Sequence, residues 1–288
     1  MRVRLLALVS SIALFGLAAV PASAASEGHD YLALGDSVPF GFSPLLNPND
    51  ASNFIGYPEI VAQRLDIKDV NATCPGEATG GFLSLTGTDN VCRPYRAAFP
   101  LHTQYNVSQM DYALRYLTGH KDTRLITLTL GANDLFRWQK DCAVVKQPFG
   151  TCPLGFGGVL AVMQANLHTI FKAIRSTGYT GLIVAVSYYA LDYNSPAAGL
   201  ALQAQIASAG STLGVKLASG FDAWAPVAAT AGGSSCAAHL LIPTPLDTTP
   251  CDVHPTPLGR DLLAGAVIDT IAASCPAHDA VACLDVNG

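Results

Sequence analysis

The 288-residue chain alternates short apolar runs with longer segments of helical periodicity, and this order of elements most constrains its fold. Apolar runs bounded by turn residues predict buried strands at 31–34, 125–130, 182–186 and 215–217, with a weaker strand near 69–72. Apolar periodicity predicts helices at 57–65, 111–117, 159–175, 200–211 and 257–272. Strands that alternate with helices favour parallel βαβ units. We therefore expect an α/β protein, a three-layer α/β/α sandwich around a mainly parallel sheet.

The first 24 residues have the features of a secretory signal. Arg2 and Arg4 precede an apolar run at 5–20, and Ala22-Ser23-Ala24 forms the small-x-small pattern of a signal-peptidase site. The alternative is a membrane anchor, but the run is shorter than the roughly 20 residues that span a bilayer. We therefore predict cleavage after Ala24, a secreted protein and no stable membrane anchor.

All eight cysteines follow this segment, which indicates disulfides formed in an oxidising compartment. The sequence contains no C-x-x-C pair, so neither a zinc site nor a redox centre is indicated. Pairing close neighbours along the chain is the simplest of many connectivities. The predicted bridges are Cys74 with Cys92, Cys142 with Cys152, Cys236 with Cys251, and Cys275 with Cys283.

The chain beyond residue 24 is acidic. Removal of residues 1–24 takes two arginines from the 16 Lys and Arg and none from the 21 Asp and Glu, which leaves a formal net charge of −7. The sequence contains no Lys/Arg cluster, so we do not expect nucleic-acid binding. Because it also lacks an internal repeat and a Ser/Gly linker, residues 25–288 are predicted to form a single domain, which we expect to be a monomer.

Two polar motifs directly follow predicted strands: Gly35-Asp36-Ser37 and Gly131-Ala132-Asn133-Asp134. In open α/β sheets, ligands bind at the carboxyl ends of the strands. Ser37 is therefore a candidate nucleophile, although the same tripeptide also forms Asx turns. Asn133 is a candidate oxyanion donor, although asparagine is also a common helix N-cap.

Two further segments can complete such a site. His254, in Cys251-Asp252-Val253-His254-Pro255, precedes the last predicted helix and is a candidate general base for Ser37. Gly76, in Cys74-Pro75-Gly76-Glu77, follows the weak second strand, where a glycine lets a backbone N–H approach an oxyanion closely. The other six histidines lack such a motif, and we expect surface or packing roles for them. Aromatic residues near these motifs are candidate walls of an apolar pocket: Phe40, Phe42, Trp138, Phe149, Phe156, Tyr188 and Tyr189.

In this order along the chain, the four motifs resemble the SGNH (GDSL-type) hydrolase family, in particular its secreted, disulfide-bearing actinobacterial lipases and esterases. The resemblance covers essentially the whole chain after residue 24. It implies a flavodoxin-like, five-stranded sheet and ester hydrolysis through an acyl-serine, with no cofactor and no metal. It makes Ser37 the nucleophile and His254 the base. The oxyanion hole would consist of the Ser37 N–H, the Gly76 N–H and the Asn133 side chain.

The sequence departs from this family at two positions. Val38 replaces the Leu of the GDSL motif, a change that the family tolerates. Cys251 occupies the position of the family's usual Asp, three residues before the His, whereas Asp252 lies two residues before it. In an extended segment Asp252 and His254 point to the same side, so Asp252 is one candidate for orienting the ring. A backbone carbonyl, as in some secreted relatives, is the other.

Other hydrolytic and nucleotide-binding motifs are absent from the sequence. It contains no G-x-S-x-G pentapeptide of an α/β-hydrolase, and no H-E-x-x-H, P-loop or G-x-G-x-x-G motif. The leading hypothesis is a secreted lipase or esterase acting on acyl esters or lipids. A carbohydrate acetyl esterase is one alternative, and a non-catalytic binding protein on the same scaffold is another.

Overall fold

The computed structural model describes residues 30–144, 155–246, 249–275 and 278–286. The predicted signal, residues 1–24, lies outside the described residues, as do Phe149 and Cys152. The bounds of the strands are β1 Asp30–Gly35, β2 Lys68–Asn71, β3 Leu125–Thr129, β4 Leu182–Val186, β5 Val215–Ala218, β6 Leu241–Leu246 and β7 Thr249–Pro255. The bounds of the helices are α1 Ser37–Phe40, α2 Tyr57–Leu65, α3 Thr79–Leu83, α4 Cys92–Ala98, α5 Gln109–Gly119, α6 Ala132–Val144, α7 Gly155–Ser176, α8 Ala197–Gly210, α9 Gly220–Ala229, α10 Pro257–Ala273 and α11 Ala280–Val286.

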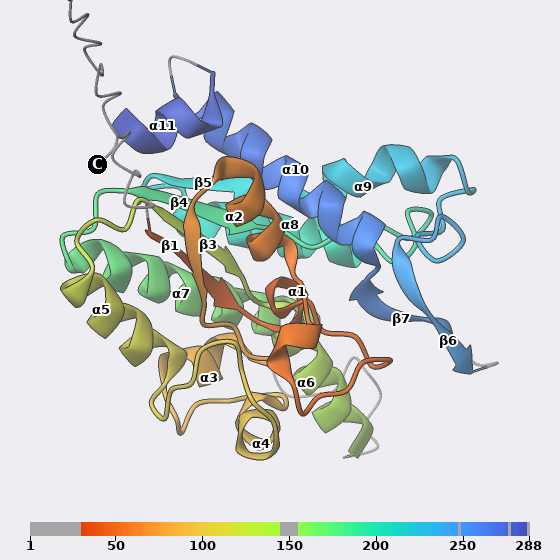
Figure 1. Ribbon diagram of the computed structural model, residues 1–288. Coiled ribbons are helices and arrows are strands. Elements are labelled where there is room, and N and C mark those ends of the chain that lie inside the picture. The colour runs from red at the N-terminus through yellow and green to blue at the C-terminus, as the bar shows by residue number, and fades with distance from the viewer. Residues whose placement is uncertain (1–29, 145–154, 247–248, 276–277, 287–288) are drawn as a thin grey trace, which may run out of the picture.

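The five predicted strands form one sheet in the order β2-β1-β3-β4-β5 (Figure 1). Every neighbouring pair is parallel, as expected. The chain goes from β1 to β2 on one side and then crosses to β3 on the other, so the strand order reverses between β1 and β3. Such a reversal leaves a crevice at the carboxyl ends of the two strands, where ligands bind in open α/β sheets.

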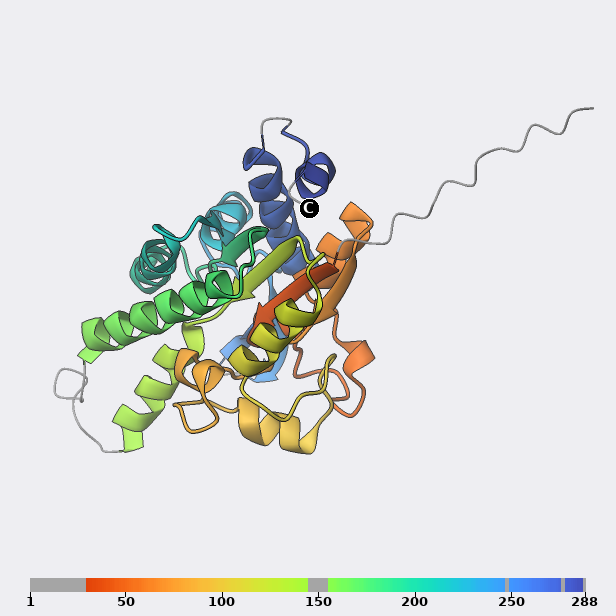
Figure 2. The same ribbon diagram turned by 90° about the vertical axis from the view of Figure 1, so that its left-hand side faces the viewer.

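Helices cover both faces of the sheet, which confirms the three-layer sandwich (Figures 1 and 2). Helices α5, α7 and α8 pack together on one face, and α2 and α10 pack together on the other. The strand β3 is buried along its whole length, as a strand covered on both faces must be. None of the helices in the described part of the chain has the length and hydropathy needed to cross a membrane.

The antiparallel hairpin of β6 and β7 is separate from the main sheet and was not predicted. It precedes α10, whose N-cap is Thr256: its hydroxyl accepts a hydrogen bond from the Gly259 N–H at 3.3 Å. Three of the predicted disulfides are present, Cys74–Cys92, Cys236–Cys251 and Cys275–Cys283. The second of them ties β7 to the segment before β6.

Candidate active site

Ser37 is the first residue of α1, immediately beyond the carboxyl end of β1. The turn between them requires glycine at position 35, because its φ is +128° and a Cβ there would lie 2.0 Å from the Thr129 carbonyl oxygen. Asp36 is the N-cap, and its Oδ1 accepts a hydrogen bond from the Val38 N–H at 3.0 Å. The serine is therefore held at the crevice between β1 and β3.

The His254 imidazole lies between Ser37 and Asp252, which is one of the two arrangements that the sequence left open. Its Nε2 is 2.8 Å from Ser37 Oγ, and its Nδ1 contacts Asp252 Oδ1. Burial on its own would raise the pKa of Asp252, but the hydrogen bonds and the charge of His254 outweigh burial and lower it below its ordinary value. The Asp252 carboxylate is thus ionised. By accepting a hydrogen bond from Nδ1, it favours the imidazole tautomer in which Nε2 carries no proton and can accept one from Ser37.

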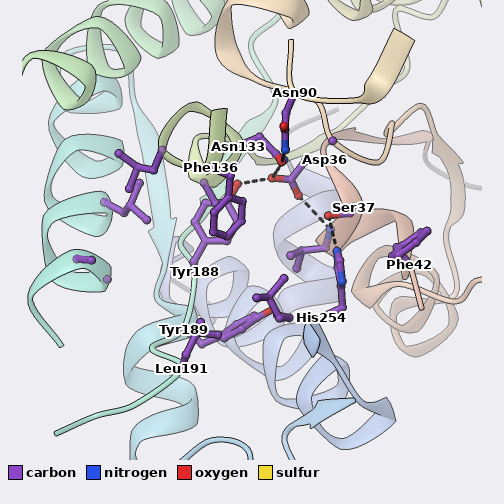
Figure 3. Close-up of a pocket in the computed structure, with 18 of the residues that line it drawn as sticks. Asp36, Ser37, Phe42, Asn90, Asn133, Phe136, Tyr188, Tyr189, Leu191 and His254 are labelled. Carbon is purple, nitrogen blue, oxygen red and sulfur yellow. Dashed lines mark hydrogen bonds between the residues drawn. The ribbon is translucent and has the colours of Figure 1, made fainter. Parts of the chain in front are cut away.

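The position of His254 depends on contacts of β7 with three other parts of the chain. The Tyr189 hydroxyl donates to the Val253 carbonyl at 2.6 Å, the Phe42 ring packs 4.8 Å from the imidazole, and Cys251 is bonded to Cys236. These contacts hold the imidazole against Ser37 (Figure 3).

Gly76 and Asn133 line the same cavity as Ser37 and His254. Gly76 follows β2 with a φ of +82°, and a Cβ there would lie 2.1 Å from a side-chain carbon of Val91, so the conformation and close packing of the backbone at this point require glycine. Asn133 is the second residue of α6 and is 6% exposed. The fold thus brings together all four predicted segments, from β1, β2, β3 and the region before α10.

The cavity has a volume of about 550 Å³ and extends from Ser37 toward α8. Its walls beyond Ser37 come from α6, from the segment after β4 and from α8, and are mostly apolar. The residues that form these walls are Leu135, Phe136, Gln139, Tyr188, Tyr189, Ala190, Leu191, Asp192, Ser195, Ala198, Gly199 and Leu202.

The aromatic walls differ in part from the prediction. Phe42, Tyr188 and Tyr189 line the cavity as expected. Trp138 and Phe156 do not: their rings pack near each other, with centroids 6.2 Å apart. Phe40 is fully buried in a second apolar cluster beside the site.

A polar network beside Ser37 was not predicted from the sequence. Asp36 is 1% exposed, and its Oδ2 accepts from the Tyr188 hydroxyl and, at 3.4 Å, from Asn133 Nδ2. Burial raises the pKa of Asp36 to about 6, although these hydrogen bonds and His254 lower it in part. Asn90 donates from Nδ2 to Asn133 Oδ1 at 2.9 Å. Asp36 lies within a recognised motif, but no sequence signal marks Asn90.

One group of possible metal ligands occurs among the described residues: Glu77, Asp89 and Cys92 lie within 4.8 Å of one another. Cys92 is bonded to Cys74, so its sulfur cannot act as a thiolate ligand. Burial, with the charge of Asp89, raises the pKa of Glu77 to about 8. This group is therefore a buried acidic pair beside a disulfide.

Three of the remaining histidines bond to backbone carbonyls away from Ser37. His102 Nε2 lies 3.1 Å from the Phe40 carbonyl, His120 Nδ1 2.9 Å from Tyr116, and His168 Nδ1 3.1 Å from Ala209. These are the packing roles expected for them.

The profile of the GDSL-like lipase/acylhydrolase family matches residues 33–262. This range contains Ser37, Gly76, Asn133 and His254. A search of curated proteins finds no match.

Solved structures with a similar fold include hydrolases of different named activities. An extracellular lipase from Streptomyces rimosus is 18% identical with a TM-score of 0.54, over 84% of this chain and 100% of that one. Phospholipase A1 from Streptomyces albidoflavus is 16% identical with a TM-score of 0.52, over 91% and 100%. A variant of an acetyl-xylooligosaccharide esterase from Geobacillus is 15% identical with a TM-score of 0.53, over 85% and 94%. At these identities the likeness concerns the fold.

Proposed function

The chain belongs to the GDSL-like lipase/acylhydrolase family, and from this premise we propose that it is a secreted serine carboxylic-ester hydrolase. The observation that carries the proposal is the 2.8 Å contact of His254 Nε2 with Ser37 Oγ in a cavity that Gly76 and Asn133 also line. A nucleophile within hydrogen-bond distance of a base, which is oriented in turn by a third group, is the arrangement that covalent catalysis requires.

The reaction would begin with attack of Ser37 Oγ on the ester carbonyl carbon, while His254 Nε2 takes the hydroxyl proton. The Ser37 and Gly76 N–H groups and Asn133 Nδ2 would stabilise the negative carbonyl oxygen. The bond to the alcohol oxygen then breaks, and His254 returns the proton to the leaving alcohol. Water, deprotonated by His254, attacks the acyl-serine and releases the carboxylic acid. Asp252 would orient His254 and stabilise the imidazolium.

The shape and lining of the cavity support a fatty-acyl ester as substrate. A volume of about 550 Å³ is within the range of small-molecule sites. Beyond Ser37 the walls offer carbon surface from α6 and α8, which would bury the methylene groups of an acyl chain at about 0.8 kcal/mol each. An acetyl group would leave most of this surface uncovered.

Secretion is part of the same proposal. It is supported by the signal-like segment at 1–24 and by three disulfides, which form and persist in oxidising compartments. Expression of the full chain in a secreting host, followed by N-terminal sequencing of the protein in the medium, tests it. We expect the mature protein to begin at Ala25.

Hydrolysis of p-nitrophenyl esters from acetate to palmitate tests the activity. We expect hydrolysis by the wild type and a loss of about 10⁴-fold or more in kcat for Ser37→Ala and for His254→Ala, with the thermal unfolding temperature retained. Activity confined to acetate would favour the carbohydrate acetyl esterase instead. Hydrolysis that is indifferent to Ser37→Ala would refute the acyl-serine mechanism.

A further inference from the structure

Both ends of the Asn133 side-chain amide are engaged by neighbours. Asn90 Nδ2 donates to Asn133 Oδ1 at 2.9 Å, and Asn133 Nδ2 donates to Asp36 Oδ2 at 3.4 Å. Figure 3 shows Asn90, Asn133 and Asp36 in a chain that ends beside Ser37. Asn133 is buried, with 6% of the residue exposed, so these contacts are made with little competition from solvent.

The orientation of this amide decides whether it can act as an oxyanion donor. Only the nitrogen end of an asparagine side chain donates, whereas its oxygen end would repel a negative oxygen. Asn90 presents an N–H to Oδ1 and so favours the orientation that directs Nδ2 toward Asp36 and the cavity. Because Nδ2 carries two hydrogens, one can bond to Asp36 while the other serves a bound ligand.

Asn90 is itself held by the loop that provides Gly76. The Asn90 N–H donates to the Gly76 carbonyl at 3.2 Å. Asp89 accepts from the Cys92 and Arg93 N–H groups at 2.9 Å each, and Cys92 is bonded to Cys74. Two proposed oxyanion donors, Gly76 and Asn133, are thus connected through Asn90. An oxyanion hole acts without reorganisation only when its donors are fixed in this way.

We propose that Asn90 is a positioning residue of the ester hydrolysis, which keeps the Asn133 amide turned so that Nδ2 faces the oxyanion. This inference rests on the proposed function. Asp36 provides the second contact of the same amide, from the residue preceding the nucleophile. Asn90 acts through Asn133 and need not touch the reacting atoms.

Replacement by alanine separates this role from substrate binding. Since the negative charge on the ester carbonyl oxygen develops in the transition state and is absent from the bound substrate, Asn90→Ala should lower kcat by about 10- to 100-fold while KM changes little. The assay is p-nitrophenyl butyrate hydrolysis beside the wild type and Ser37→Ala, with thermal unfolding followed for each. If Asn90→Ala changes kcat less than twofold, or raises KM alone, the positioning role is overturned.

The Asn90→Asp variant makes the pH dependence of kcat a test of the positioning role, because a purely structural role of Asn90 would not change this pH dependence. A carboxylate can only accept, so it would attract Nδ2 of Asn133 and turn the amide oxygen toward the oxyanion. Once protonated, the new carboxyl can donate to Asn133 Oδ1 and restore the orientation. We expect the ratio of variant to wild-type kcat to rise at least several-fold as the pH falls through the pKa of the new group, whereas the ratio for Asn90→Ala stays flat.

The charged groups around position 90 are present in both proteins, so the ratio removes the pH dependence that the two proteins share, and a separate fit of each kcat profile accounts for any change that the new charge causes in these neighbours. They are the carboxylates of Asp36 and Asp89, Arg137, which donates to the Asp89 carbonyl at 3.0 Å, and His254 across the cavity. The matched control is Asn53→Asp, the same change at an exposed asparagine, which should give a flat ratio near one.

The outcomes separate the two proposals. A flat ratio for Asn90→Asp with an active wild type overturns the role of Asn90 and leaves the esterase proposal standing. A wild type without Ser37-dependent hydrolysis overturns both. A rise confined to Asn90→Asp supports both.

Discussion

At the scale of single residues, the contact of Asp252 with His254 favours a carboxylate over a backbone carbonyl as the partner of the ring. The sequence left this choice open because Cys251 occupies the usual position of the acid. In β7, residues two apart project to the same side, and the lowered pKa of Asp252 keeps it ionised as pH falls. An acid two residues before the histidine, instead of three, can therefore accept a hydrogen bond from His254 Nδ1.

Asp252→Asn tests this interpretation. An amide can donate its N–H to Nδ1 and favour the tautomer that carries its proton on Nε2, which cannot accept the Ser37 proton. We expect kcat at neutral pH to fall by about 10³- to 10⁴-fold. Steady-state kinetics with p-nitrophenyl butyrate measures it, with Asp122→Asn as an exposed control. A decrease smaller than tenfold would favour a backbone carbonyl as the partner.

Some site residues could be predicted from the sequence because the proposed chemistry allows only one or two residue types at these positions, and because each position directly follows a predicted strand. Ser37, Gly76 and Asn133 each follow a predicted strand, and the fold places them on one cavity. Asn90 could not be predicted, because nothing local marks it: its contact with Asn133 depends on how the loop around the Cys74–Cys92 disulfide packs against α6.

At the scale of elements, strands buried on both faces were the most predictable part of the fold. Residues 125–129 and 182–186 are continuous apolar or β-branched runs, and the structure begins both strands at the predicted residues. The β6–β7 hairpin escaped prediction because Leu241–Leu246 and Thr249–Pro255 each contain two prolines, which argue against strand structure. Antiparallel pairing with register shifts accommodates them here.

A substitution on helix α8 tests whether the acyl chain of the proposed substrate extends toward this helix. Ala198 and Ala204 are both exposed residues of this helix, but only Ala198 lines the cavity. Ala198→Phe should fill space that the distal methylenes of a long chain would occupy. We expect the ratio of kcat/KM for palmitate to that for butyrate to fall by about 10-fold, since each lost methylene contact is worth about 0.8 kcal/mol. Chain-length profiles of both variants measure this change.

Ala204→Phe is the matched control, because it adds the same side chain to the same helix outside the cavity. It should leave the ratio of palmitate to butyrate unchanged. An identical shift in both variants would indicate an effect on the helix as a whole. No shift in Ala198→Phe would place the acyl chain elsewhere in the cavity.

At the scale of the whole molecule, buried carboxyl groups lie together with Ser37 at the point where the strand order of the sheet reverses. Glu77 is 3% exposed, and its Oε2 lies 3.5 Å from Gln109 Nε2. Gln109 also bonds both backbone groups of Gly35, accepting from its N–H at 2.6 Å and donating to its carbonyl at 3.0 Å. A buried acid next to Gly76 is therefore connected to the turn that presents Ser37.

This burial makes the stability of the whole protein depend on pH. The pKa of Glu77 is raised from 4.5 to about 8 in the folded state, mainly by desolvation. The folded state therefore holds a proton that the unfolded chain releases at lower pH. The stabilisation is fully present below pH 4.5 and is lost as pH rises toward about 8, a change of a few kcal/mol. Asp36, whose pKa is raised from 3.8 to about 6, also makes the protein less stable as pH rises, but between pH 3.8 and pH about 6.

Glu77→Gln should remove the part of this dependence that lies above the pKa of Asp36. Glutamine stays neutral, so we expect the free energy of unfolding to fall less between pH about 6 and pH about 8 than in the wild type. Urea unfolding with the disulfides intact, at closely spaced pH values, measures it, and Asp122→Asn supplies the same change at an exposed carboxyl. Equal slopes in Glu77→Gln and the wild type would mean that Glu77 is already ionised at pH 6. A steep wild-type slope that only Glu77→Gln flattens would identify Glu77 as the group whose ionisation lowers stability between pH about 6 and pH about 8.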